Sequence, residues 1–252
     1  MGISGLIITF NEEKIIGACI DALFKVCDEV IIVDSFSTDA TVQIAKNKGA
    51  LVIQKNFLGD GPQRSFGLPY CKNDWILNLD ADEFLDQDSV GFIIEKRYLN
   101  TEYDAFSFRV KNFLQDKIID FAGWYPDHKI RFFNKKSAHP SSDKVHQKII
   151  STNAKKLKTH ILHYGSHSFF QIIAKKNQYA DWNAQQLFDQ GKKVSSIKPL
   201  VNGLTSFIRC YFFKKGIFNG IDGLTISLTQ AYFSYIKYAN LIQLHKLSKK
   251  KL

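Results

Sequence analysis

The first ninety residues alternate short apolar runs with segments of helical character. The runs are almost continuously apolar, which is typical of parallel strands that are covered on both faces. In residues 15–23 the apolar side chains recur at helical spacing and form one stripe. The expected strands are residues 3–10, 30–33, 51–54 and 75–79, and further helices are expected over residues 40–47 and around Gln63 and Arg64. This strand–helix order predicts an α/β fold with a Rossmann-like, mostly parallel sheet and right-handed crossovers.

The pattern changes after Leu85. Residues 103–110 alternate apolar and polar positions, which predicts a strand with one buried face. Two further strands, over residues 130–133 and 145–150, are expected to be antiparallel. A helix is expected from Ser168 to Gln190, and several helical segments rich in Phe and Tyr follow it. The last part of the chain is therefore expected to be helical.

Composition and charge separate this last part from the rest. The 252 residues are 45% hydrophobic and 23% charged, which excludes a disordered chain and a polytopic membrane protein. The formal net charge is +10, and residues 192–252 hold eleven Lys and Arg but one acid, Asp222. The preceding residues are therefore neutral overall. We predict a catalytic α/β domain over residues 1–191 and a basic, aromatic-rich helical extension over residues 192–252.

The basic extension has the composition of helices that lie on a membrane surface. Its longest stretch without a basic residue, 216–236, contains Asn219 and Asp222 and is a poor transmembrane helix. Amphipathic helices on an anionic membrane surface, at the inner face of the cytoplasmic membrane, fit better. The alternative is an extra helical layer with solvated lysines, and we expect a mixture of the two.

Four cysteines without paired spacing indicate a reducing compartment. They form no Cys-x-x-Cys pair and have no spacing to histidine that suggests zinc. The chain begins with an apolar run of strand length and shows no secretory signal. We therefore expect free, buried thiols and a cytoplasmic location.

Polar side chains collect where the predicted strands end. Asn11, Asp34, Asp39, Asp80 and Asp82 all follow apolar strands. The carboxyl ends of parallel strands share one edge of the sheet, and ligands bind there. Two carboxylates two residues apart suit Mg²⁺ or Mn²⁺, which take oxygen ligands and leave positions for phosphate oxygens; the alternative is a solvated acidic turn. Asn11 is also expected to cap the first helix.

Eight short motifs follow one another along the chain. The first four are TFNEE (residues 9–13), VDSFSTD (33–39), GPQR (61–64) and LNLDADE (77–83). The later four are GWYPD (123–127), RFF (131–133), VHQ (145–147) and HY (163–164). The ordered set resembles family 2 glycosyltransferases with the GT-A fold, and within them the lipopolysaccharide core β-1,4-glucosyltransferases that act on inner-core heptose. The resemblance covers about residues 3–190 and implies a UDP-sugar donor and inversion at the anomeric carbon.

The resemblance implies roles for the residues that match the nucleotide-binding motifs. Thr9 and Asn11 would line the nucleotide pocket, and Arg64 would contact the nucleotide. Asp34 and Ser35 would face the uracil or the ribose, although many family members carry a second acid where Ser35 stands. Such groups meet the needs of the donor, because uracil and ribose need hydrogen-bond partners and the diphosphate needs positive charge.

The resemblance also implies a metal site. Asp80 would lie near the ribose and contribute to the site, and Asp82 would ligate Mg²⁺ or Mn²⁺ through the diphosphate. Asp39 would hold its turn. His163 is the histidine expected to complete the metal shell, and His146 is its competitor, with an alternative place beside the acceptor.

Inversion needs a carboxylate that takes the proton of the acceptor hydroxyl as C1 of the donor is attacked. Asp127 is the first candidate, because Trp124 and Tyr125 beside it suit sugar binding. Glu83, next to the metal motif, is the second. The relatives usually carry Val-His-Glu where this chain has Val145-His146-Gln147. If that Glu is the base, the base of this protein lies elsewhere or the protein is impaired.

The main hypothesis is an inverting, metal-dependent hexosyltransferase that acts on the lipopolysaccharide inner core. UDP-glucose is the expected donor, with galactose as the other candidate sugar. Another cell-surface glycan is the alternative acceptor. A sugar nucleotidyltransferase would carry a Gly-rich, basic loop after the first strand, where this chain has Asn11-Glu12-Glu13. A basic membrane module with a degenerate site is favoured by Gln147 alone, and nucleic acid is not an expected partner because no nucleic-acid-binding signature occurs.

Overall fold

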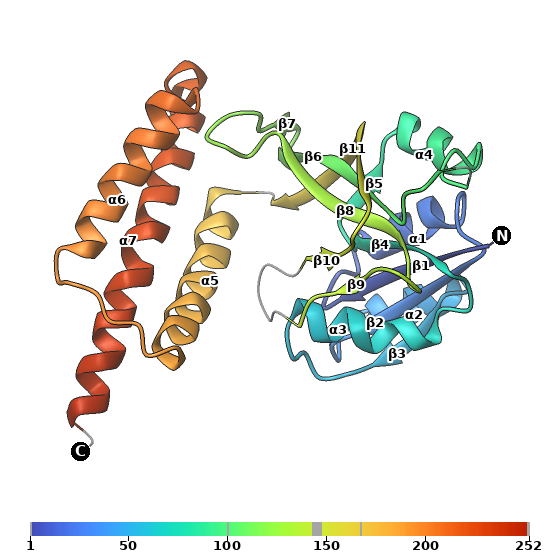
Figure 1. Cartoon of the computed structure of the whole chain (residues 1–252), viewed down its shortest axis with the longest axis horizontal. Coiled ribbons are helices and arrows are strands. Elements are labelled where there is room, and N and C mark those ends of the chain that lie inside the picture. Colours follow the sequence, from blue (N-terminus) through green and yellow to red (C-terminus); the bar gives the residue numbers. More distant parts are fainter. Residues whose placement is uncertain (1, 100, 143–147, 167, 251–252) are drawn as a thin grey trace. The chain divides into compact units, whose positions relative to one another are not determined.

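The chain forms two compact units (Figure 1). The computed structural model describes residues 2–99, 101–142, 148–166 and 168–250. The sheet unit comprises Met1–Asn112 and Pro126–Gly165, and the helical unit comprises Phe113–Tyr125 and Ser166–Leu252.

The first half of the sheet is parallel, as predicted. Its strands lie in the order β3 (Leu51–Gln54), β2 (Glu29–Asp34), β1 (Ile3–Thr9) and β4 (Trp75–Asp80). The helices that connect them are α1 (Ile16–Leu23), α2 (Thr41–Asn47) and α3 (Asp60–Gly67), and the short turn η1 (Leu68–Tyr70) follows α3. The α/β fold class expected from the strand–helix order is therefore confirmed.

The second half of the sheet is mainly antiparallel, which confirms the expected change after Leu85. The strands continue from β4 through β8 (Asp127–Asn134), β6 (Ala105–Leu114) and β11 (Ala154–Ser166) to β5 (Glu83–Leu85). β8 runs antiparallel to β4 and β6, and β5 runs antiparallel to β11. Only Ala81 and Asp82 separate β4 from β5, so the sheet curls until its last strand returns to the end of β4.

Two short pairings complete the strands. β7 (Lys117–Ile118) pairs with the end of β6, and β9 (His139–Pro140) pairs with β10 (Ile149–Ile150). Of the strand expected over residues 145–150, the structure shows the last two residues as β10. Residues 143–147 lie outside the described residues.

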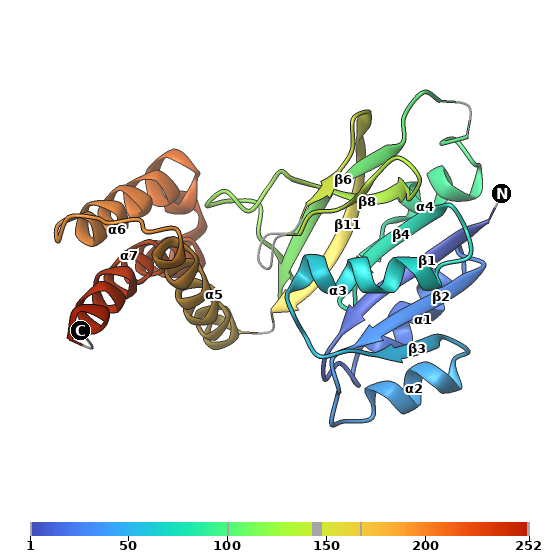
Figure 2. The ribbon, with the colours of Figure 1, turned by 60° about the horizontal axis from the view of Figure 1, so that its bottom comes forward.

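Helices cover both faces of the parallel half (Figure 2). One face packs against α1, α2 and α4 (Gln87–Ile94), and the other packs against α3 and η1 through Phe66 and Leu68. Aromatic rings fill the first face where the two halves of the sheet meet. Trp75 stacks on Phe132 with ring centroids 4.9 Å apart, and Tyr98 meets Phe132 edge-on at 4.9 Å. The core therefore joins β4 to β8 close to the edge where polar side chains collect.

Asn11 does not cap α1. The helix begins at Ile16, and Asn11 has a left-handed backbone with φ of 55°. Its Oδ1 atom accepts a hydrogen bond from Thr38 N–H at 2.8 Å, and its own N–H donates to Ser37 Oγ at 2.8 Å. The residue joins the loops after β1 and β2, because its side chain bonds the neighbouring loop and not its own helix.

The helical unit is built around one long helix, α7 (Gly220–Lys250). Both α5 (Phe169–Asp189) and α6 (Lys198–Ile208) pack on α7, and the turns η2 (Arg209–Phe213) and η3 (Gly216–Asn219) connect α6 to it. The sequence predicts a boundary after residue 191, whereas α5 lies in the helical unit. Its Ile172 packs in one apolar cluster with Ile226 of α7 and with residues of the segment 113–125.

Two further observations concern the whole chain. The four cysteines are buried and free, as predicted. Among the helices that the structure describes, none combines the length and the apolar character that crossing a bilayer requires.

We expect Gly67→Ala to destabilise the sheet unit. A Cβ atom at Gly67 would lie 2.6 Å from Leu6 Cδ1 and 2.7 Å from Val33 Cγ2. The helix α3 would have to shift from the sheet, at a cost of about 1–3 kcal/mol. Gly91→Ala in α4 is the matched control, because its Cβ would find Glu95 Oε1 as its nearest atom, at 3.7 Å. That change is expected to stabilise the helix by about 0.5–1 kcal/mol. Urea unfolding followed by circular dichroism measures both, and equal free energies of unfolding would contradict the close packing of α3.

Candidate active site

The ends of β1, β2 and β4 form one edge of the sheet, and the predicted site residues lie along it. Thr9 is paired with Asp34 of β2, and Ile8 is paired with Asp80 of β4. Parallel pairing therefore brings together residues that are far apart in the sequence. Ser35 continues the edge directly after β2.

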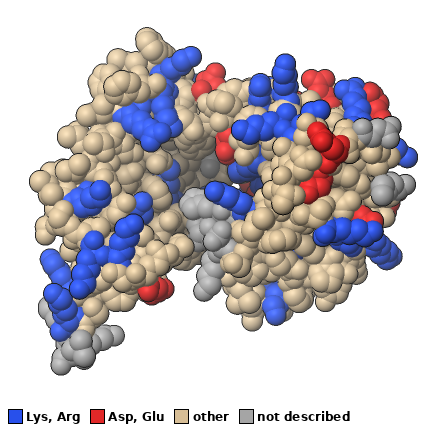
Figure 3. All heavy atoms as spheres, viewed as in Figure 1, with Lys and Arg blue, Asp and Glu red and all other residues tan. Residues whose placement is uncertain are grey.

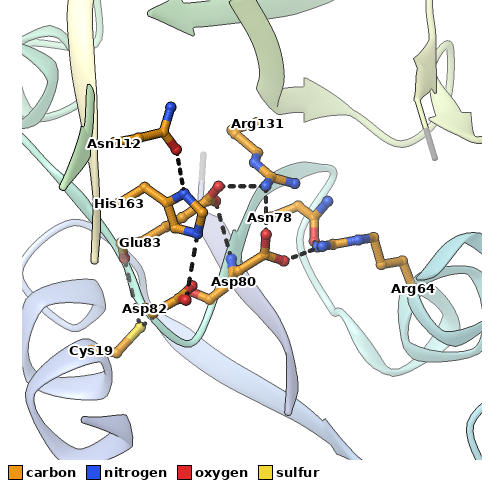
Figure 4. Close-up of polar contacts among 9 residues, drawn as sticks. All are labelled: Cys19, Arg64, Asn78, Asp80, Asp82, Glu83, Asn112, Arg131 and His163. Atoms are coloured by element: carbon orange, nitrogen blue, oxygen red, sulfur yellow. Dashed lines mark hydrogen bonds and ion pairs between the residues drawn. The ribbon is translucent and has the colours of Figure 1, made fainter. Parts of the chain in front are cut away.

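A network of buried charges holds the end of β4 (Figure 4). The Asp80 carboxylate lies between two guanidinium groups: Arg64 contacts Oδ1, and Arg131 donates to Oδ2 at 2.7 Å. Arg131 also donates to Glu83 Oε1 at 2.5 Å, and Glu83 Oε2 accepts the Asp80 backbone N–H at 3.2 Å. Arg64 donates in addition to Asn78 Oδ1. Both carboxylates and both guanidinium groups are thus part of one connected set.

The network keeps Asp80 ionised. Burial alone raises the pKa of Asp80, but the guanidinium groups of Arg131 and Arg64 outweigh it and hold the pKa well below its usual range. Burial lowers the pKa of Arg131, and the charges of Asp80 and Glu83 reverse this and raise it. The Asp80 side chain is 31% exposed, whereas Arg64 and Arg131 are buried. Asp80 is therefore the member of the network that a ligand can reach.

Glu83 is fully buried, and both of its oxygens accept hydrogen bonds within the network. An acceptor sugar hydroxyl cannot reach a carboxylate in this position. Its place next to the metal motif suggested a base, but the structure makes it a positioning residue that holds Arg131.

A β-bulge places Arg131 in the network. Phe106 of β6 is paired with Phe132, but the next residue, Ser107, is paired with Ile130, so Arg131 is the extra residue in β8. A bulge changes the direction of the extra side chain relative to its neighbours. An arginine between Ile130 and Phe132 therefore points to Asp80 and Glu83.

The turn after β2 is held by its own polar residues. Asp34 is fully buried and accepts hydrogen bonds from Ser37 N–H at 2.9 Å, Ser37 Oγ and Gln54 Nε2 at 3.0 Å. Asp39 accepts from Glu13 N–H and Thr41 N–H, so it holds its turn as the resemblance implies.

Two hydroxyl groups lie on this edge, that of the half-buried Ser35 and that of the buried Thr9. The Ser35 hydroxyl accepts from Gln63 Nε2 at 3.2 Å. The buried Thr9 hydroxyl makes no hydrogen bond to any residue that the structure describes. A buried polar atom without a partner is uncommon, so Thr9 Oγ1 is a candidate contact for a ligand.

Asp82 and His163 face each other on the other side of the β4–β5 turn (Figure 4). Asp82 Oδ2 lies 3.4 Å from His163 Nε2, and His163 Nδ1 lies 2.7 Å from Asn112 Oδ1. When Nδ1–H donates to Asn112 Oδ1, Nε2 faces Asp82; there it can donate a proton to the carboxylate or, without that proton, ligate a cation, as in the outer-shell arrangement of metal-binding histidines. A Cβ atom at Gly165 would lie 2.4 Å from His163 Nε2, so the glycine keeps this space open.

Asp82 and His163 can supply two of the ligands that a divalent cation needs. One carboxylate and one imidazole can hold Mg²⁺ or Mn²⁺ when a diphosphate and water supply the other ligands. Within the described residues, no group of three or more His, Cys, Asp and Glu side chains is arranged around one point. Asp80, expected to share the site, is held instead by Arg64 and Arg131.

The pKa of His163 reflects the same surroundings. Burial lowers the pKa, but the hydrogen bond and charge of Asp82 outweigh it, and the pKa lies above its ordinary value. The pocket around Nε2 therefore favours a positive charge, from a proton or a cation.

Residues 4–172 match the family model described as glycosyl transferase family 2. The chain belongs to this family. An uncharacterized glycosyltransferase of Rickettsia bellii (strain RML369-C) is 35% identical, over 96% of this chain and 86% of the relative. The lipopolysaccharide core biosynthesis glycosyltransferase LpsC of Rhizobium meliloti (strain 1021) is 28% identical, over 97% of this chain and 93% of LpsC. The resemblance stated from the motifs is confirmed.

Two solved structures are similar in part. Glucosyl-3-phosphoglycerate synthase from Mycobacterium tuberculosis, in complex with Mn²⁺, UDP and phosphoglyceric acid, has a TM-score of 0.36 and 26% identity, covering 44% of this chain and 43% of the synthase. S. aureus TarS has a TM-score of 0.45 and 16% identity, covering 88% of this chain and 46% of TarS. The chain thus matches less than half the length of either protein.

The predicted acceptor-side residues of this family 2 glycosyltransferase lie in three places. Asp127 opens β8, is exposed, and lies at the same edge of the sheet as the end of β4, because the two strands are antiparallel. Trp124 and Tyr125 are half-buried in the helical unit, where Trp124 packs against the apolar cluster around Phe121. His146 lies outside the described residues.

Sequence reasoning assigned no role to Arg131, Asn112 or Gly165. The sequence does contain a pattern that points to Arg131, because a charged residue inside the apolar run Ile130–Phe133 suggests a buried partner. No sequence pattern points to Asn112 or Gly165, since their roles depend on β6 and β11 lying beside each other at His163.

Arg131→Met is expected to lower the free energy of unfolding by about 3–5 kcal/mol, because Glu83 would be left buried without its partner. Removing both charges with Arg131→Met and Glu83→Leu should recover part of this loss. Arg97→Met is the matched control: its ion pair with Glu95 is 58% exposed on both sides and contributes about 0–1 kcal/mol. Chemical unfolding of the wild type, Arg131→Met, Glu83→Leu, the double variant and Arg97→Met measures this, and a double variant as unstable as the sum of its two single changes would contradict the coupling.

Proposed function

We propose that this family 2 glycosyltransferase moves a hexose, glucose from UDP-glucose, with inversion onto a heptose of the lipopolysaccharide inner core. The observation that carries the proposal is the pairing of a partly exposed, ionised Asp80 with the Asp82–His163 site across one turn. The similarity to LpsC along nearly the whole chain supports the acceptor. The cytoplasm, at the inner face of the membrane, is where such a donor and acceptor would meet.

The nucleotide would bind along the edge formed by β1, β2 and β4. The half-buried Ser35 side chain offers a hydrogen bond to uracil or ribose, and Asp80 offers a carboxylate to a ribose hydroxyl. Thr9 would line the pocket, and its buried hydroxyl has no partner among the described residues. Arg64 acts on the nucleotide through Asp80, because its guanidinium nitrogens already contact Asp80 and Asn78.

The diphosphate would lie at Asp82 and His163. When bound there, Mg²⁺ or Mn²⁺ supplies positive charge that stabilises the departing diphosphate. Asn112 holds His163 in the tautomer that leaves Nε2 free, and Gly165 keeps its backbone clear of both ligands.

Asp127 would act as the base. Its carboxylate takes the proton of the acceptor hydroxyl while the hydroxyl oxygen forms a bond to C1 of the donor. The bond from C1 to the diphosphate oxygen breaks on the opposite face, so UDP leaves and the configuration at C1 is inverted. The exposed position of Asp127 at the site edge supports this role, and the burial of Glu83 argues against the alternative.

Asp82→Asn is expected to abolish Mn²⁺-dependent hydrolysis of UDP-glucose and to weaken Mn²⁺ binding measured by calorimetry. Asn112→Ala, which changes no ligand, should weaken Mn²⁺ binding by about 10–100-fold. Asp21→Asn is the control, because Asp21 is an exposed acid in α1 paired with Lys48. Wild-type turnover that does not depend on a divalent cation, or unchanged Mn²⁺ binding in Asp82→Asn, would overturn the metal site.

Mass spectrometry of the lipopolysaccharide core tests the acceptor and the base together. A strain without this gene should lack one core hexose, and the wild-type gene should restore it. Asp127→Asn should fail to restore it, because loss of a general base slows transfer by about 10²–10⁴-fold. An unchanged core in the deletion strain would remove the acceptor assignment, and full restoration by Asp127→Asn would remove the base assignment.

A further inference from the structure

The helix α6 packs its small and polar side inward. A Cβ atom at Gly203 would lie 3.2 Å from Tyr235 Cβ of α7, so the two helices are in close contact there. Ser206 Oγ donates to Gln230 O at 3.4 Å and accepts from Ser234 Oγ at 3.1 Å. A helix on a protein surface normally buries its apolar stripe, and α6 does the opposite.

The apolar stripe of α6 faces away from α7. Leu200, Val201, Leu204 and Ile208 recur at helical spacing, and all four are exposed. Four residues on one helix face are more than the scattered surface apolar residues of an ordinary soluble protein.

The stripe continues into the connection between α6 and α7, at the end of the hairpin that these helices form in Figure 1. Phe212 of η2 lies four residues beyond Ile208. Phe213 and Phe218 are 80% and 82% exposed, and Ile221 at the start of α7 is also exposed. We call these residues, together with the α6 stripe, the outer apolar face.

Basic residues adjoin the outer apolar face along the chain. Arg209 follows α6 directly and Lys215 lies between η2 and η3, and both are exposed. Lys198 at the start of α6 is also exposed, with its Nζ 5.9 Å from the Tyr238 ring of α7. The one acid of residues 192–252, Asp222, is paired with Lys117 at 2.9 Å. On the side seen in Figure 3, basic side chains outnumber acidic ones over the helical unit. The surroundings of the face therefore complement a negatively charged partner.

We propose that the outer apolar face inserts into the headgroup region of a bilayer that contains anionic phospholipid. Aromatic and aliphatic side chains that enter the interface, with lysine and arginine at the headgroups, are the pattern of in-plane helices. The 11 residues of α6 extend about 16 Å, too short to cross the hydrocarbon core, so the helix lies in the plane.

A second copy of the chain fits this face less well. Self-pairing would bring the adjoining lysines and arginines of two copies together, and like charges across an interface oppose association. This proposal rests on the proposed function, because it names the membrane at which the sugar transfer would take place. Binding to that membrane can be measured without any sugar transfer.

The test is flotation of the full chain with vesicles of phosphatidylethanolamine and phosphatidylglycerol, compared with vesicles of phosphatidylcholine. We expect binding to the anionic vesicles that weakens with added salt. The triple variant Leu204→Ser, Phe213→Ser and Phe218→Ser should bind at least about tenfold more weakly. Circular dichroism should be unchanged, because the three side chains are exposed. Phe170→Ser is the matched control, since Phe170 of α5 is 80% exposed but lies outside the face.

Site-specific labelling locates the inserted residues. The native cysteines are buried, so a polarity-sensitive fluorophore can be attached selectively at Phe218→Cys. Its emission should shift to shorter wavelength with anionic vesicles, and a label at Phe170→Cys should not respond.

The proposal is wrong if the wild type does not bind vesicles, if the triple variant binds as well as the wild type, or if the two labels respond equally. A wild-type dimer that the triple variant dissociates, with vesicle binding unchanged, would also overturn it and assign the face to a second copy. UDP-glucose hydrolysis without vesicles should be normal in the triple variant. Failure of membrane binding is therefore distinguishable from failure of the proposed transfer.

Discussion

One buried and one partly exposed carboxylate lie at the turn from β4 to β5, and the sheet unit depends on how their charge is balanced. Guanidinium groups and hydrogen bonds replace the hydration that Glu83 loses completely and Asp80 loses in part. Arg131 of β8 contacts both, and Arg64 of α3 contacts Asp80. The network thus joins the parallel half of the sheet, the antiparallel half and the helix on one face. Displacement of any of these elements would leave a buried charge without its partner.

Asp80, Asp82 and Glu83 are neighbours in the chain, but their side chains lie in different surroundings. Glu83 is sealed and holds Arg131, whereas Asp80 shows part of its carboxylate at the sheet edge. Asp82, between them, points to His163. The same chemical group is thus a positioning residue, a candidate ribose contact and a candidate metal ligand within four residues, since surroundings decide what a carboxylate can do.

In the helical unit, the packing of α6 on α7 decides which side chains are exposed. Close contact between α6 and α7 requires small residues such as Gly203 on the inner side, which leaves the larger apolar residues of α6 outside. The charge surplus lies in the same part of the chain, while residues 1–191 are neutral. The excess of positive charge therefore bears on the partner that the helical unit binds. The charges at the sheet edge balance one another.

The sequence by itself determined the parallel strands, their connecting helices and the polar residues at the strand ends, because these follow from local periodicity and from the common edge of parallel strands. It also identified the family through its ordered motifs. Only the tertiary structure decided which carboxylate is sealed, that Asn11 joins two loops and that α5 belongs with α7. These outcomes depend on contacts between residues far apart in the chain: Arg131 meets Glu83 across 48 residues, and a bulge in β8 directs it there. No local pattern encodes that meeting, because it arises only when β8 pairs with β4 and β6.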